Sequence, residues 1–237
     1  IIERAAKWGH PAIAITDHGV VQAFPDAQIA AKKNKIKVLY GVEGYLVDDG
    51  IPLAINEKGQ NLDDTYVVFD LETTGLSPIN NEITEIGAVK VIDGKISDTF
   101  EMLVKPNQKI SQKITDITGI TNEMVKDKPP IEEVLPKFIE FIGGLPLVAH
   151  NVEFDYGFLC ENYNRVYKKE FNRKKSCTMK MYRKWYKDQY DENAPCAKLG
   201  DVVLELLGNE EYLSYLSNSH RGLNDAEFTQ KVYENLI

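Results

Sequence analysis

Two acidic residues stand in a stretch of sequence that otherwise has the character of a buried strand. In "VVFDLETTGL", residues 67–76, Asp70 and Glu72 are two positions apart. Their carboxylates therefore project from the same face of an extended strand, the face that also carries Val68. Because two like charges repel strongly away from water, the pair indicates a site at which a positive charge is bound.

Further along the chain, other polar side chains occupy similarly apolar settings. Asp155 lies in "EFDYGFL" at the border of an apolar helix stripe, and Asp225 begins a helix whose apolar residues follow at spacings of three and four. His220 precedes Asp225 by five residues in "SHRGLND". Asn151 stands next to His150 at the end of the strand-like segment "LPLVAH". Each residue alone is better explained as a helix cap or a surface group, and only the joint pattern predicts a site.

The residue types decide which chemistry such a site would support. A set of Asp and Glu ligands without Cys favours Mg²⁺ or Mn²⁺ over zinc. Two such ions about 4 Å apart can activate a water molecule and stabilise the leaving oxygen in phosphodiester hydrolysis. His220 could then accept the proton of that water, because imidazole side chains exchange protons near neutral pH.

The composition is that of an ordinary globular protein, with 237 residues, of which 43% are hydrophobic and 27% charged. No stretch approaches the roughly 20 apolar residues of a membrane-spanning helix, and the first residues lack the features of a secretory signal. A cytoplasmic location is therefore expected. The three cysteines form no CxxC pair, which argues against a disulfide framework and a thiolate zinc site. Because the sequence does not begin with Met, we expect a fragment of a longer protein.

The net charge of −8 is unevenly distributed along the chain. Between Arg165 and Lys187, ten Lys or Arg residues stand against one acid, Glu170, and aromatic residues are interleaved with them. Such a basic block could follow a phosphate backbone and stack on bases. A solvated helix and loop explains it equally well.

The elements that must position these residues follow from the hydrophobic pattern. Residues 1–52 carry a partial βαβ pattern, residues 53–64 form a polar, turn-rich linker, and residues 65–237 form a complete domain. This domain begins with three strands, the last two joined at Asp93-Gly94, a dipeptide suited to a type I′ turn. The order of elements predicts an α/β fold with a mixed central sheet flanked by helices on both faces. Helices are expected over 111–120, 121–125, 131–144, 152–167, 197–208 and 223–237, and a short strand over 145–150.

The motifs together resemble a known family, the DEDDh-type 3′-to-5′ exonucleases of RNase H-like fold, which include the proofreading domains of polymerases. The segments that carry the resemblance are "FDLETTGL", "EITEIGAVKV", "DITGITNEMV", "VAHNVEFDYGFL" and "HRGLNDAEFT", in the expected order over residues 65–237. The resemblance implies that His220 is the general base and that Thr73 and Asn151 contact the terminal nucleotide. It also implies two metal ions, Mg²⁺ or Mn²⁺, held by Asp70, Glu72, Asp155 and Asp225.

Residues 1–52 are similar to part of the PHP domain of PolC-type DNA polymerase III α subunits, into which an exonuclease of this kind is inserted. Asp17, His18 and Glu43 resemble PHP metal ligands. Other ligands of that domain are absent from the sequence, so a supporting role for the segment is favoured over a working metal site. The resemblance implies that the substrate is a single-stranded or frayed 3′ end of DNA. The expected partners are the rest of a polymerase and its replication machinery, with no membrane partner.

The match to the family has departures, and two alternatives stay open. Cys177 stands where Asp is common, and Gly222 and Asn224 stand where Ala and another residue are usual. None of these changes removes a predicted ligand. The first alternative is an RNA-trimming 3′-to-5′ exonuclease, because the same set of motifs is compatible with a DNA or an RNA substrate. The second is a module that binds nucleic-acid 3′ ends without cutting.

Overall fold

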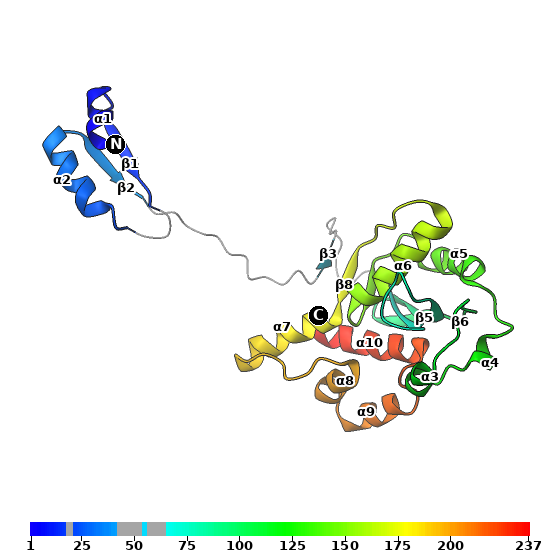
Figure 1. Ribbon diagram of the computed structural model, residues 1–237. Helices are drawn as coiled ribbons and strands as arrows, with labels where there is room; N and C mark the ends of the chain where they lie inside the picture. Colours follow the sequence, from blue (N-terminus) through cyan, green and yellow to red (C-terminus); the bar gives the residue numbers. More distant parts are fainter. Residues whose placement is uncertain (18–20, 42–53, 56–64) are drawn as a thin grey trace. The chain divides into compact units, whose positions relative to one another are not determined.

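The computed structural model of the chain describes residues 1–17, 21–41, 54–55 and 65–237 (Figure 1). Its internal contacts divide the chain into two units, Ile1–Gly50 and Ile51–Ile237, and each unit is described by itself. Within the described ranges, no helix has the length and the apolar character needed to cross a membrane.

The smaller unit has the predicted βαβ arrangement. Strands β1 (Ala12–Ile15) and β2 (Lys37–Tyr40) pair in parallel, and α2 (Phe24–Asn34) connects them. Helix α1 (Ile2–Lys7) precedes the first strand. The buried apolar residues form a small core of Ile2, Ala5, Ala27 and Ile36.

Of the three residues that resemble PHP metal ligands, only Asp17 is among the described residues. Its Oδ2 accepts a hydrogen bond from the backbone N–H of Ala23 at 2.7 Å, immediately before α2. His18 and Glu43 lie outside the described residues. The contact observed for Asp17 is thus a hydrogen bond to the residue that precedes α2.

A mixed sheet forms the centre of the larger unit, in the strand order β3-β8-β7-β4-β5-β6. The strands β4, β5 and β6 pair antiparallel in succession, whereas β7 runs parallel to both β4 and β8. The predicted α/β fold with a mixed sheet is confirmed. The bounds of the strands are β3 (Ala54–Ile55), β4 (Tyr66–Thr73), β5 (Ile83–Ile92), β6 (Lys95–Leu103), β7 (Leu147–Ala149) and β8 (Lys175–Cys177).

Two local features of the sheet bear on the sequence predictions. Asp93 and Gly94 both have positive φ, 50° and 72°, as a type I′ turn between β5 and β6 requires. Ala54 and Ile55, the described residues of the predicted linker, pair antiparallel with β8. The six-stranded sheet therefore includes a short strand that comes from the segment predicted to be a linker.

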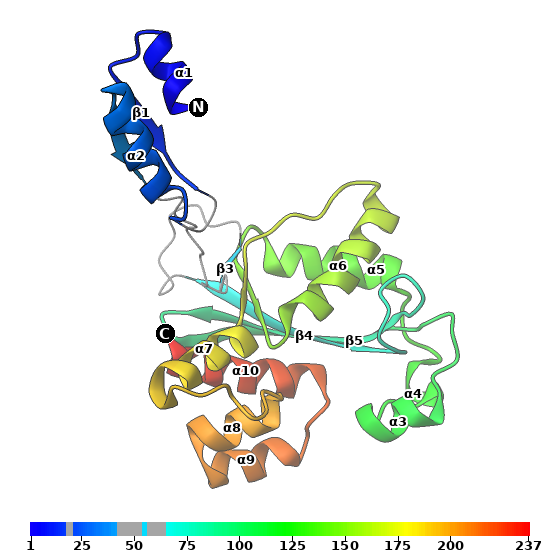
Figure 2. The same cartoon turned by 60° about the vertical axis from the view of Figure 1, so that its left-hand side comes forward.

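Helices cover both faces of this sheet, as Figure 2 shows for α5 and α6 on one side and α7 to α10 on the other. On the first face, Phe69 of β4 packs with Phe138 of α5 and Phe158 of α6. On the second face, Val68 packs with Tyr233 of α10. The bounds are α3 (Gln112–Thr118), α4 (Asn122–Val125), α5 (Ile131–Ile142), α6 (Val152–Tyr167), α7 (Thr178–Tyr190), α8 (Leu199–Leu207), α9 (Asn209–Leu216) and α10 (Gly222–Leu236).

The predicted helices are all present, and the first two, α3 and α4, begin with side-chain caps. Ser111 accepts a hydrogen bond from the Ile114 N–H, and Thr121 accepts one from the Met124 N–H. The sequence pattern did not identify α7, α9 or β8. Helix α9 and strand β8 are short, and the apolar residues of α7 are interleaved with the Lys and Arg residues of the basic block.

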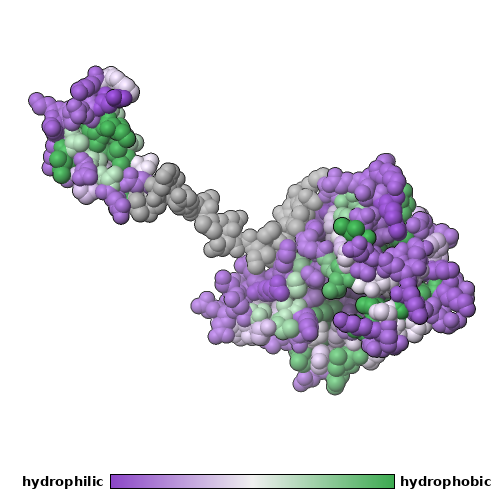
Figure 3. All heavy atoms as spheres, in the orientation of Figure 1, coloured by the Kyte–Doolittle hydropathy of each residue, from purple (hydrophilic) through white to green (hydrophobic). Residues whose placement is uncertain are grey.

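Hydrophobic side chains on the face of the larger unit seen in Figure 3 form separate patches within a mainly hydrophilic surface. Among the described residues of this unit, the most exposed large apolar side chains are Leu76 and Ile79, at 83% and 81%. Both lie in the loop that follows β4. Apolar groups are therefore presented to solvent next to the strand that carries Asp70 and Glu72.

Candidate active site

The alternation of side chains along β4 places Asp70 and Glu72 on the face covered by α10. Phe69 and Leu71 enter the core under α5 and α6, whereas Val68 packs toward α10. Glu72 is buried at 8% exposure, and Asp70 is half-buried. The strand thus carries two carboxylates into the interface between the sheet and the last described helix.

Asp155 joins this strand from the first turn of α6. It is 2% exposed, and its Oδ1 accepts a hydrogen bond from the Leu71 N–H at 3.1 Å. Asn151, between β7 and α6, has a positive φ of 62°. This left-handed residue turns the chain sharply from the strand into the helix, and the turn sets Asp155 against β4.

Asp225 comes from the first turn of α10 and is 6% exposed. Its Oδ1 accepts a hydrogen bond from the His220 N–H at 3.1 Å, which folds the segment before the helix back over the carboxylate. His220 itself has a positive φ of 62°. Glu72, His220 and Asp225 each offer one ligand atom within 4.8 Å of the others, a group able to hold a metal ion.

Burial, and to a smaller extent mutual repulsion, raises the pKa values of these acids. Burial, followed by repulsion from Asp225 and other acids, raises the pKa of Glu72 to about 9. Burial raises the pKa of Asp155 to about 8 and that of Asp225 to about 7, despite the hydrogen bonds that both accept. Burial and the charge of Asp155 also raise the pKa of Asp70 well above its usual range.

The repulsion among these acids bears on whether the site fits a divalent cation. A divalent cation would replace the protons and remove the repulsion, and a donor set made mainly of carboxylates, beside the one imidazole of His220, suits hard ions such as Mg²⁺ and Mn²⁺. The donors present therefore fit such an ion.

A cleft of about 790 Å³ opens beside these residues. Asp70, Asn151, His220 and Asp225 line it, so the structure brings four of the predicted site residues to one cavity. Thr73 has a different environment: it is buried, and its hydroxyl donates a hydrogen bond to the Gly75 carbonyl at 2.7 Å.

Comparison with known protein families identifies the family of the chain. Residues 67–233 match the family described as Exonuclease, RNase_T. The chain belongs to this exonuclease family. The predictions of an exonuclease and of its RNase H-like fold are confirmed.

Relatives at higher identity place this exonuclease domain in much longer proteins. The chain is 52% identical over 232 residues to a DNA polymerase III PolC-type from Clostridium perfringens, and the match covers 98% of this chain and 15% of the relative. It is 46% identical over 237 residues to the corresponding protein of Caldanaerobacter subterraneus, covering 16% of that relative. The exonuclease chain thus spans about 15% of the length of the curated relatives it matches.

Solved structures show the same fold. Exonuclease X in complex with 5′ overhanging duplex DNA is 29% identical, with a TM-score of 0.50, and the match covers 72% of this chain and 90% of that one. The nuclease domain of 3′hExo, a DEDDh family member bound to rAMP, is 23% identical with a TM-score of 0.58 over 73% and 92% of the two chains. At that identity the second likeness shows the fold alone.

His150 of the exonuclease fixes one wall of the cleft. Its Nε2 lies 2.8 Å from the Ala197 carbonyl oxygen and its Nδ1 lies 2.9 Å from the Thr178 hydroxyl. Because a carbonyl only accepts, the proton is assigned to Nε2. Burial lowers the pKa of His150 to about 4, so the ring is neutral and ties β7 to α7 and to the loop before α8.

The sequence analysis missed several residues that line the same cleft. Arg183 of α7 and Lys198 before α8 are exposed cations, and Tyr215 of α9 is buried beside the acids. Arg183 carried a signal, because it belongs to the basic block. Tyr215 carried none, because α9 was not predicted.

The basic block itself spans the end of α6, a loop, β8 and α7. Part of its charge is neutralised within the protein. Lys175, for example, lies 2.6 Å from Glu153 and is 10% exposed. The block residues in salt bridges with Glu or Asp are Arg165, Lys175, Lys180 and Lys184. Arg183 is the residue of the block that lines the cleft.

Proposed function

We propose that this exonuclease hydrolyses the terminal phosphodiester at the 3′ end of DNA and acts as the proofreading part of a PolC-type replicative DNA polymerase III. The observation that supports it best is the convergence of acids from three elements: Asp70 of β4 and Asp225 of α10 line one cleft, and Asp155 of α6 is hydrogen-bonded to the backbone of β4 beside Asp70. The identity to PolC-type polymerases over almost the whole chain supports DNA over RNA.

The proposed metal site uses Asp70, Glu72, Asp155 and Asp225 as ligands of two Mg²⁺ or Mn²⁺ ions. Ions bound there would supply a water of lowered pKa and would neutralise charge on the leaving oxygen. Asp155 is held in place by the Leu71 N–H and Asp225 by the His220 N–H, so both are oriented before any ligand arrives.

His220 is the proposed general base. It lines the cleft, and its ring lies near both Glu72 and Asp225. An imidazole at this position can accept a proton from a water molecule held among the acids and release it to solvent. The strained backbone of His220 is consistent with a site that fixes the ring in one place.

The substrate is proposed to lie along the cleft. Asn151 lines its wall and can contact the terminal nucleotide, and Thr73 is proposed to do so from the end of β4. Arg183 and Lys198 add exposed positive charge to the same cleft, which suits a phosphate backbone. Leu76 presents apolar surface for a base.

Residues 1–52 are proposed to be part of a PHP-like segment that supports the exonuclease within the larger polymerase. The parallel β1-α2-β2 unit and the match of the relatives through these residues support this proposal. A cytoplasmic location, with the polymerase and its replication machinery as partners, belongs to the same proposal.

A labelled primer with a mismatched 3′ terminus tests the proposal. We expect release of single nucleotides that requires Mg²⁺ or Mn²⁺, that is lost in Asp70→Ala, and that is kept in Asp98→Ala, which removes an exposed acid from β6. Metal-dependent release that survives Asp70→Ala would refute the assignment of the site.

Parallel digestion of DNA and RNA oligomers of one sequence tests which nucleic acid is the preferred substrate, and faster cutting of RNA would overturn the DNA assignment. DNA binding without any product in excess Mn²⁺ would instead indicate a binding module.

A further inference from the structure

Glu85 on β5 is a fully buried acid that the proposed chemistry does not use. It is the cross-strand partner of Glu72, so the two carboxylates project from the same face of the sheet. A buried carboxylate is stable only when charged or polar partners surround it. The partners of Glu85 therefore indicate its role.

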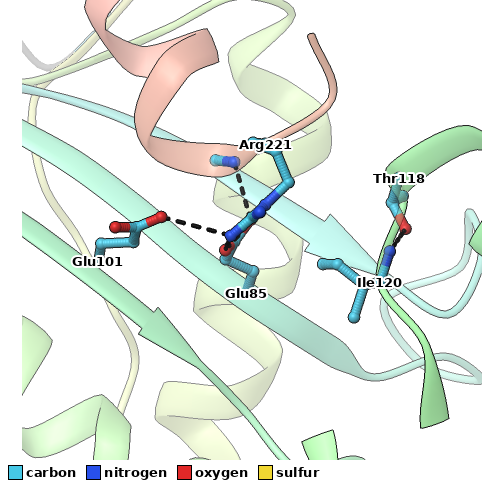
Figure 4. Close-up of polar contacts among 6 residues, drawn as sticks. Glu85, Glu101, Thr118, Ile120 and Arg221 are labelled. Carbon is cyan, nitrogen blue, oxygen red and sulfur yellow. Dashed lines mark hydrogen bonds and ion pairs between the residues drawn. The ribbon is translucent and has the colours of Figure 1, made fainter. Parts of the chain in front are cut away.

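Those partners belong to the segment that leads into α10 (Figure 4). The Arg221 guanidinium donates to both oxygens of Glu85, from Nη2 to Oε1 at 2.7 Å and from Nε to Oε2 at 3.1 Å, with a longer bond from Nε to Oε1 at 3.3 Å. The Gly222 N–H donates to Oε2 at 3.0 Å. Glu85 thus holds both the residue before α10 and the first N–H of the helix, a donor that has no acceptor within the helix.

The backbones of β5 and α10 also touch at this point. A Cβ built on Gly87 would lie 1.9 Å from the Gly222 carbonyl carbon, and one built on Gly222 would lie 2.8 Å from the Gly87 nitrogen. Glycine at both 87 and 222 therefore permits the close approach seen in this chain. The start of α10 is fixed to β5 by ionic, hydrogen-bond and backbone contacts.

The fixed residues lie between the two predicted site residues of this segment. His220 immediately precedes Arg221, and Asp225 follows Gly222 by three positions. If the backbone of Arg221 and Gly222 could move, the His220 ring and the Asp225 carboxylate would move with it. Catalytic groups need placement within about 0.5 Å, so such freedom would reduce turnover.

We propose that Glu85 is a positioning residue of the exonuclease, which sets His220 and Asp225 by holding Arg221 and the first turn of α10. The inference rests on the proposed function for its effect on turnover. Its structural part, the restraint on residues 219–227, stands independently of activity.

Glu101 of β6 provides a matched control. Its Oε1 also faces the Arg221 guanidinium, at 3.4 Å, but its side chain is 46% exposed. The Gly222 N–H donates to Glu85 and not to Glu101. We expect Glu85→Gln to lower kcat about 10- to 100-fold with KM changed less than about twofold. Glu101→Gln should stay within about twofold of the wild type in both constants, because an exposed pair contributes little. Equal kcat values in the two variants would overturn the proposal.

A double variant separates positioning from folding. Arg221→Gln alone leaves the buried Glu85 charge without its partner and should lower the melting temperature most. Glu85→Gln combined with Arg221→Gln removes both charges, so the melting temperature should recover while kcat stays low. Recovery of kcat together with the melting temperature would show a purely structural pair and would overturn the proposal.

Hydrogen exchange in metal-free protein gives a readout that does not depend on activity. Glu85→Gln should increase amide exchange in a peptide covering residues 219–227, and Glu101→Gln should not. Unchanged exchange in Glu85→Gln would refute the restraint. An inactive wild-type protein with the expected exchange pattern would instead refute the proposed function and leave the restraint intact.

Discussion

Asp155 and Asp225 each accept a hydrogen bond from a backbone N–H, of Leu71 and of His220 respectively. Asparagine keeps an accepting oxygen at that position but carries no charge. Substitution by Asn therefore removes the charge of the acid and leaves its local hydrogen bond in place.

Asp155→Asn and Asp225→Asn should each lower turnover of a DNA primer roughly a thousandfold, because a ligand charge worth several kcal/mol is lost. The melting temperature without metal should stay equal or rise, because the remaining acids repel one another less. Gel assays of product release and thermal denaturation in chelator test both parts. A large drop in the metal-free melting temperature would mean that these acids serve folding instead.

At the level of residues, the sequence indicated groups whose local setting was unusual. Asp70, Glu72 and Asp225 stood out because each is an acid in an apolar pattern. Glu85 did not stand out, because its importance comes from Arg221, which is 136 positions away in the sequence. A partner at that distance becomes visible only when the fold brings the two together.

Between elements, the contact of β5 with α10 depends on the lack of a side chain at Gly87. Gly87→Ala should force the two backbones apart and destabilise the larger unit by about 3 kcal/mol, in the upper part of the range for overpacked sites. Turnover should fall as well, because the start of α10 carries His220 and Asp225. Urea denaturation monitored by circular dichroism measures the change.

Gly144→Ala is the matched control for this prediction. A Cβ at Gly144 meets no atom within 4 Å, so the added methyl group should leave both stability and turnover unchanged. Similar unfolding midpoints for the two variants would contradict the proposed close contact.

The elements that the sequence predicted are those with a strong period or a specific turn. The hairpin at Asp93-Gly94 and the amphipathic α5 are examples. Helix α7 was missed although Met181, Tyr182, Trp185 and Tyr186 recur at helical spacing, because Lys and Arg residues of the basic block are interleaved with them. The β8 strand was missed because three residues carry no measurable alternation.

Across the whole molecule, the raised pKa values of the acids make stability depend on pH. Because burial raises the pKa values of Asp225, Asp155 and Glu72 to about 7, 8 and 9, the folded metal-free protein binds more protons than the unfolded chain at intermediate pH. This contribution to stability is present below the unfolded pKa values near pH 4 and is lost progressively as the pH rises toward about 9.

The metal-free melting temperature should therefore fall by roughly 5–10 °C between about pH 5 and pH 9. Saturating Mn²⁺ should reduce this fall, because an ion binds the deprotonated acids and stabilises the folded state most at high pH. Asp225→Asn should show a shallower dependence than the wild type without metal. Differential scanning fluorimetry across the pH range measures all three, and a flat metal-free curve would contradict the assigned repulsion.

The acids of the proposed site come from β4, from α6 and from α10, so the site needs three parts of the chain that the ribosome makes at different times. A nascent polypeptide that has been extended only as far as residue 221 has every strand of its six-stranded sheet and still lacks Asp225. Nuclease activity should thus begin only after α10 has been synthesised, and truncated translation products that stop before α10 should be harmless to the nucleic acids around them.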